Sequence, residues 1–172
     1  MDTPFYLNKF QEIAGQLAVT TLDKTGMETW TGIWSDAVFI KFQKKAWTNT
    51  FPDTNSSGSS IFFSAWITDK AIKEGKIFYN IHALRLRKLN GYLITSREFA
   101  TAFRERFKHF EQDWPNISTA FGPQTLMEGW EKMLPGNPGA LLPGMVHRFL
   151  KINFIIDDLL AERKIPVSKN IP

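Results

Sequence analysis

The chain has 172 residues, 43% of them hydrophobic and 22% charged, which is typical of one globular domain and not of a disordered or fibrous protein. It contains no cysteine, and this excludes a disulfide framework, a thiolate zinc site and a cysteine nucleophile. The formal net charge of +4 is compatible with an anionic partner, but an ordinary protein surface also carries such a charge.

The N-terminal sequence lacks the features of a signal peptide. No basic segment leads into an apolar run after Met1, and no apolar run in the chain reaches the roughly 18 residues of a membrane-spanning helix. We therefore expect a cytoplasmic protein without a membrane partner.

The first expected element is a helix from Pro4 to Asp23. Thr3 is the expected cap, Pro4 suits the first helical position, and Gly26 is the expected stop. Strands are then expected over Glu28–Trp34, Ala37–Ala46, Ser60–Ile67 and Lys76–Leu86. Thr48–Ser59 is rich in turn residues and predicts a loop that serves either as a lid or as a linker, and Thr68–Gly75 predicts a short helical turn.

Helices are expected to dominate the second half of the chain. Thr95 and Glu98 have the spacing of a capping box, and an aromatic stripe follows them at helical intervals. Gln124–Met133 predicts a short helix, Met145–Arg163 predicts the last helix, and 165–172 predicts a loose tail.

The order of these elements defines the expected fold class. Strands that are grouped together and helices that follow them are typical of an α+β protein. We expect a mainly antiparallel sheet of about four strands, preceded by one helix and followed by about three helices. No shift in composition marks a boundary, so residues 1–172 are expected to form one domain.

The expected strands have two different faces, because side chains alternate along a strand. One face is uniformly apolar and is the expected core, with Val38, Ile40, Phe42, Ile61, Phe63, Ala65, Ile67, Ile77, Tyr79, Ile81 and Ala83. The opposite face mixes large rings with polar groups, which is the composition of a ligand-binding cleft. Its candidate binding residues are Lys41, Phe62, Trp66, Phe78, Asn80 and His82. The alternative is that a later helix covers this face.

His82 is the candidate for catalysis, since histidine exchanges protons near neutral pH. A structural histidine held by hydrogen bonds is the alternative. The sequence contains no second member of a catalytic set, no metal-ligand spacing and no cofactor motif, so we expect neither a metal nor a cofactor.

A short basic run follows the fourth expected strand. Arg85 and Arg87 are candidate anion-binding residues, and together with Lys41, Lys44 and Lys45 they could form one basic edge. The alternative is a solvated edge whose charges prevent aggregation.

Three functions remain open on these observations. The first is a non-enzymatic binding domain that holds a small molecule or a protein segment on the mixed sheet face. The second is a single-stranded nucleic-acid-binding domain, in which rings stack on bases. The third is a small hydrolase-like enzyme that uses His82. An exposed aromatic patch would also be compatible with a homodimer.

Overall fold

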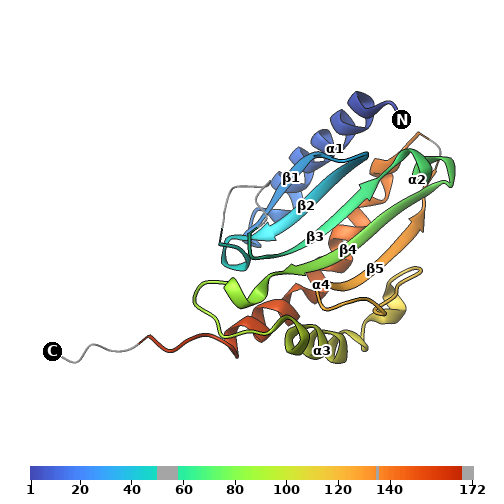
Figure 1. Ribbon diagram of the computed structural model, residues 1–172. Helices are drawn as coiled ribbons and strands as arrows, with labels where there is room; N and C mark the ends of the chain where they lie inside the picture. Colours follow the sequence, from blue (N-terminus) through green and yellow to red (C-terminus); the bar gives the residue numbers. More distant parts are fainter. Residues whose placement is uncertain (50–57, 135, 168–172) are drawn as a thin grey trace.

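A five-stranded antiparallel sheet forms the centre of the computed structural model, which describes residues 1–49, 58–134 and 136–167. The strands follow one another across the sheet in chain order, as a meander (Figure 1). They are β1 (Met27–Trp34), β2 (Ala37–Lys44), β3 (Ser60–Ile67), β4 (Lys76–Leu84) and β5 (Thr125–Lys132). The expected α+β class is confirmed, with one strand more than the sequence predicted.

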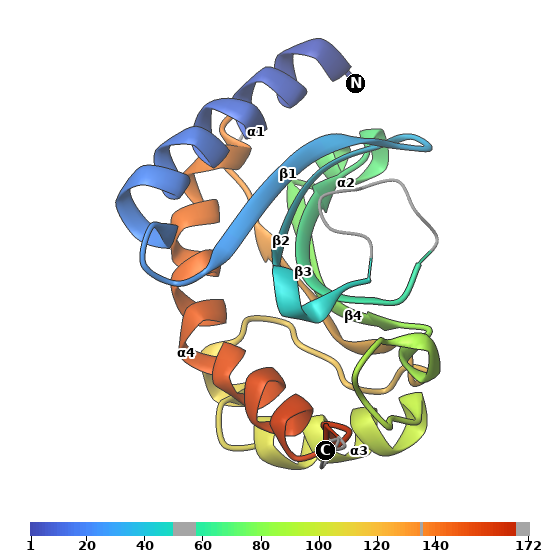
Figure 2. The same cartoon turned by 90° about the vertical axis from the view of Figure 1, so that its left-hand side faces the viewer.

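The α-helices lie before, within and after this sheet. They are α1 (Thr3–Leu17), α2 (Asp69–Lys73), α3 (Ser96–Phe107) and α4 (Leu142–Ala161). The sheet is curved, and α1 and α4 lie on its convex side (Figure 2). Short 3-10 turns connect the elements at Lys45–Trp47, Leu86–Lys88, Glu111–Asp113 and Pro138–Ala140.

The core lies between the convex face of the sheet and the helices α1 and α4. Every strand residue that the sequence assigned to the core is buried, because alternation places them all on this face. Aromatic rings join the two layers: Phe149 of α4 stacks on Phe63 of β3 with ring centroids 4.5 Å apart. The alternate side chains of the strands are not part of this core, and they lie on the opposite, concave face.

The first helix begins and ends differently from the prediction. Asp2, and not Thr3, caps α1, because its carboxylate accepts a hydrogen bond from the backbone N–H of Phe5 at 3.1 Å. The α-helix ends at Leu17 and continues as a π-helical turn over Ala18–Leu22. Gly26 follows with a φ of 68°, a left-handed conformation that favours glycine.

The largest correction concerns the segment that was expected to be a short helix. Residues Gln124–Met133 contain β5, which pairs with β4 along almost its whole length. Their leucine, methionine and glutamate residues favour a helix locally, but hydrogen bonding to an otherwise open sheet edge outweighs that weak preference. Glu128 and Glu131 would approach each other on a helix, but on the strand they are three positions apart and lie on opposite faces of the sheet.

Other boundaries differ by a few residues. β4 ends at Leu84 and not Leu86, because Arg85 adopts a φ of 50° and turns the chain out of the sheet. β2 ends at Lys44, where a 3-10 turn begins. α4 begins three residues earlier than predicted, at Leu142, and ends at Ala161.

The predicted Thr95 cap is confirmed at the start of α3, but Glu98 bonds to the Thr95 hydroxyl and not to its backbone N–H. The hydroxyl of Thr95 accepts a hydrogen bond from the N–H of Glu98 and donates one to its carboxylate. The aromatic stripe behind it packs inward through Phe99, Phe103 and Phe107. α3 contacts α4, β4 and β5, so it packs against the edge of the sheet that β5 forms.

Two predicted features fall mostly outside the described residues. These are the Thr48–Ser59 loop, of which 50–57 are not described, and the tail 165–172, of which 168–172 are not described. Across the ranges that are described, no helix has both the length and the apolar character needed to span a membrane.

Candidate functional site

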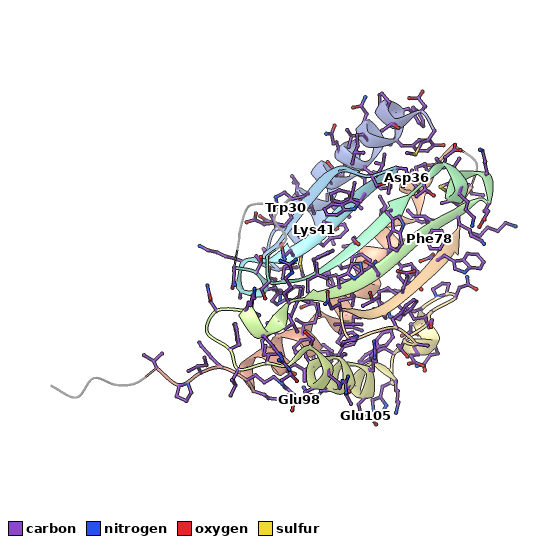
Figure 3. The ribbon with its side chains drawn as sticks, viewed as in Figure 1. Trp30, Asp36, Lys41, Phe78, Glu98 and Glu105 are labelled. Atoms are coloured by element: carbon purple, nitrogen blue, oxygen red, sulfur yellow. The ribbon has the colours of Figure 1, made fainter. Side chains whose placement is uncertain are left out.

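The concave face of the sheet is organised in rows that run across the strands. Cross-strand pairing aligns Gly32, Phe39, Trp66, Phe78 and Trp130 in one row, and Trp30, Lys41, Ser64, Asn80 and Glu128 in the next. We call these the aromatic row and the polar row. Figure 3 labels Trp30, Lys41 and Phe78 over three different strands of the sheet.

Rings in the aromatic row pack against their neighbours. Trp66 of β3 stacks on Phe78 of β4, with ring centroids 5.5 Å apart and planes 24° apart. The ring of Phe39 lies over Gly32, where an added Cβ would be only 3.1 Å from the ring. A larger residue at position 32 would push against the Phe39 ring, so this glycine leaves space for the ring.

Lys41 is the cation of the polar row and is only 9% exposed. Its ammonium group lies 4.3 Å from the centre of the Phe62 ring and 5.9 Å from that of Trp30. Aromatic faces attract such a cation, and the attraction is stronger when water is excluded. The positive charge is therefore held inside the concave face, next to the rings.

A chain of hydrogen bonds joins Ser64, Asn80 and His82. The Ser64 hydroxyl donates to Asn80 Oδ1 at 2.6 Å, and Asn80 Nδ2 donates to His82 Nε2 at 2.8 Å. The second ring nitrogen, Nδ1, lies 3.2 Å from the backbone carbonyl oxygen of Gln124 and 3.2 Å from the Thr125 hydroxyl. These partners fit a neutral imidazole with its proton on Nδ1, because Nε2 must accept from Asn80.

Burial lowers the pKa of His82, and the carbonyl of Gln124 opposes part of that shift. Protonation would also place an N–H of His82 against the Asn80 amide N–H. Both effects keep this histidine neutral near neutral pH.

Glu128 brings a carboxylate to the polar row from β5, directly opposite Asn80. Burial raises its pKa, and a hydrogen bond from the Asn80 amide partly opposes this shift. Asn80 thus uses its oxygen for Ser64 and its amide group for His82 and Glu128, and it is the central connection of the site.

Arg104 of α3 positions the segment that holds His82. Its guanidinium group donates to the backbone carbonyls of Phe121, Gly122, Thr125 and Leu126, at 2.8 to 3.2 Å. Gln124 lies within this segment, and its carbonyl accepts from the N–H of Ala83 as well as facing His82. One arginine therefore anchors the loop before β5 against the sheet.

A cavity of about 560 Å³ opens on the concave face. Such a volume lies within the range of small-molecule sites. Its lining comes from all five strands and from the segments that follow β4 and precede β5: Trp34, Ala37, Phe39, Lys41, Ser60, Phe62, Ser64, Trp66, Asn80, His82, Leu84, Arg85, Gln124 and Glu128. Trp66 and His82, whose accessibility decides whether a guest can reach the face, are both partly exposed.

The structure brings most of the predicted site residues together. Lys41, Phe62, Trp66, Asn80 and His82 all line the cavity. Phe78, the sixth candidate, is outside the lining, and its ring stacks on that of Trp66 from the neighbouring strand.

The predicted anion-binding pair is divided. Arg85 lines the cavity, whereas Arg87 lies in the following turn and is outside the lining. The single basic edge is not formed, because Lys41 is enclosed in the concave face and Lys44 bonds to Asp157 of α4.

The lining also includes residues that were not among the candidates: Trp34, Ala37, Phe39, Ser60, Ser64, Leu84, Gln124 and Glu128. Glu128 was missed because its segment was interpreted as a helix. Two features of the sequence indicated a strand. Gly129 is unfavourable inside a helix. Glu128 and Trp130 also alternate with smaller or apolar residues, which is the pattern of a strand.

Comparison with protein-family models, with curated proteins and with solved structures gives no match. The part of the chain that the structure describes contains no group of three or more histidine, aspartate or glutamate side chains able to hold a metal ion.

Proposed function

We propose that the protein is a non-enzymatic binding domain that holds a small molecule in the cavity of the concave face. The observation that carries the proposal is the cavity of about 560 Å³ whose walls combine large rings with a row of polar groups. Rings provide apolar contact area, and a few fixed polar groups orient a ligand.

The polar groups favour binding over catalysis. A general base needs a free lone pair within reach of the substrate. Both ring nitrogens of His82 have partners within the protein, and the Ser64 hydroxyl points its proton at Asn80 and not at a base. The network supports a fixed, neutral surface for recognition.

The test uses N-phenyl-1-naphthylamine, an uncharged fluorophore whose emission rises in apolar surroundings. We expect saturable binding to the wild-type protein. Trp66→Ala should raise the dissociation constant at least about tenfold, because it removes a large ring from the cavity wall. Ser64→Phe should also weaken binding, because its side chain would occupy the cavity.

Trp130→Ala is the matched control. Trp130 belongs to the same aromatic row and is partly exposed, but it lies outside the cavity lining. Its dissociation constant should stay within about twofold of the wild type. Absence of saturable binding to a folded wild-type protein, or equal losses in the two tryptophan variants, would refute the proposal.

A further inference from the structure

The geometry points to an amphipathic organic anion as the ligand, with its acidic group against Arg85 and its apolar body directed along β3 toward Trp66. This inference rests on the proposed function, since it assigns a chemical class to the occupant of the same cavity.

The charges of the lining favour an anion. Its ionisable side chains are Lys41, His82, Arg85 and Glu128. His82 is neutral in its hydrogen-bonded form, so the described residues of the lining include two basic side chains and one acidic side chain. Burial also raises the pKa of Glu128, which reduces its tendency to carry a charge. An anionic ligand would therefore be attracted to this cavity.

Arg85 is the residue placed to receive the acidic group. It is exposed at the end of β4, and its φ of 50° turns the chain immediately after Leu84, at the rim of the cavity. Among the described residues, nothing forms a hydrogen bond or ion pair with its guanidinium group. A guanidinium group can bind a carboxylate through two parallel hydrogen bonds.

The lining changes character along the strands. Trp34, Phe39 and Trp66 lie at one end, where β1 and β2 meet in a hairpin and β3 finishes. Most of the polar lining lies toward the other end of β3 and β4, where Ser60, His82, Arg85 and Gln124 accompany Phe62 and Leu84. Ser60 and Trp66 are six positions apart on β3, which is about 20 Å of strand. An amphipathic molecule matches this gradient from polar to aromatic.

Arg85 and the aromatic end of the lining determine which way round such a ligand lies. The guanidinium group of Arg85 binds the acidic group at one end of the cavity. The apolar body then crosses the polar row toward Trp66 and Phe39.

The experiment is a competition between the bound fluorophore and two molecules of equal chain length, octanoate and 1-octanol. It is carried out at about pH 7.5, where a carboxylic acid with a pKa of about 4 to 5 is ionised. We expect octanoate to displace the fluorophore at a concentration at least about tenfold lower than 1-octanol, because only octanoate engages Arg85.

The two arginines supply a matched pair of variants. Arg85→Gln should abolish most of the preference for octanoate. The affinity of this variant for 1-octanol should stay within about twofold of the wild-type value. Arg87→Gln removes the same charge two residues away, outside the lining, and should keep the preference. Both residues are exposed, so neither change is expected to prevent folding.

The other outcomes separate the two proposals. Equal displacement by octanoate and 1-octanol would overturn the anionic ligand but leave the cavity as a binding site. Equal loss of preference in both variants would overturn the assignment to Arg85 in favour of general surface charge. A fluorophore that fails to bind the wild-type protein at all would refute the proposed function itself.

Discussion

At the scale of single residues, a side chain that lies close to the backbone of the neighbouring strand limits which residues that strand accepts. Tyr79 lies on the convex face of β4, and its hydroxyl donates to the carbonyl of Pro115 at 2.5 Å. That hydroxyl passes directly over Gly129 of the neighbouring strand, where a Cβ would overlap it. The glycine is needed here for space and not for backbone freedom.

Gly129→Ala should therefore lower the free energy of unfolding by about 1 to 3 kcal/mol, because Tyr79 must move and lose its hydrogen bond. Chemical denaturation measures this loss. Gly122→Ala is the control, since nothing lies within 4 Å of its added Cβ, and it should change stability by less than about 0.5 kcal/mol. Equal effects of the two changes would contradict this explanation.

His82 should make stability depend on pH. Because burial lowers its pKa in the folded protein, the unfolded chain takes up a proton first as the pH falls below about 6.5. The free energy of unfolding should then decrease, by at most about 1.4 kcal/mol per pH unit for one proton. Glu128 has the opposite sign: its pKa is raised, so its burial costs stability above about pH 4.5 and that cost disappears on acidification.

A comparison of variants separates the contribution of His82 to this pH dependence from that of other titratable groups. Denaturant unfolding between about pH 7.5 and 6 should show a smaller decrease for His82→Gln than for the wild type. His147→Gln, at an exposed position on α4, should retain the wild-type decrease. Identical slopes in all three proteins would show that His82 is not held neutral.

At the scale of elements, polar contacts fix the helices to the sheet at a few points. Asp157 of α4 accepts from Lys44 of β2 at 2.5 Å and from the indole N–H of Trp47 at 2.9 Å. Lys44 also donates to Asn153, one turn earlier on α4. Because Trp47 is fully buried, its N–H depends on this carboxylate for a partner.

Asp157→Ala should reduce the free energy of unfolding by about 1 to 3 kcal/mol, since it leaves the Trp47 N–H buried without a partner. Asp158→Ala removes the adjacent carboxylate, which is exposed, and should change stability by less than about 0.5 kcal/mol. Thermal or chemical unfolding of the two variants makes the comparison. A similar loss in both would mean that the contact to Trp47 adds little.

At the scale of the whole molecule, the two faces of one sheet have separate roles. The convex face carries the core with α1 and α4 (Figure 2), and the lining of the cavity lies on the concave face. This arrangement bears on the nucleic-acid alternative, which needs rings and cations on an open surface. Trp66 is stacked on Phe78, and Lys41 is almost fully enclosed, so neither is presented as a separate platform for a base or a phosphate.

We therefore expect no saturable binding of a fluorescent dT oligonucleotide at about 0.15 M salt, where charges on the surface are largely screened. Binding that appears at low salt should come from the net charge of +4, fall steeply as salt rises and be insensitive to Trp66→Ala. Fluorescence anisotropy measures both properties. Tight binding that Trp66→Ala weakens would instead support the single-stranded nucleic-acid function.

For β2, β3 and β4, the amino-acid sequence by itself determined which side chains share the core face and which share the opposite face. Alternation along β2, β3 and β4 is a local property, so Phe62, Trp66, Asn80 and His82 were placed on one face without a structure. The Thr95 cap of α3 was predictable for the same reason, because its donor and acceptor are three residues apart.

Only the tertiary structure decided the nature of β5 and the closure of the site. Glu128 joins Asn80 because two strands far apart in the chain pair side by side, and that pairing outweighs the helical preference of the segment. Arg104 holds Gln124 in place through carbonyl groups that no sequence spacing connects to it. Long-range hydrogen bonds of this kind depend on the folded topology, and local patterns therefore could not predict them.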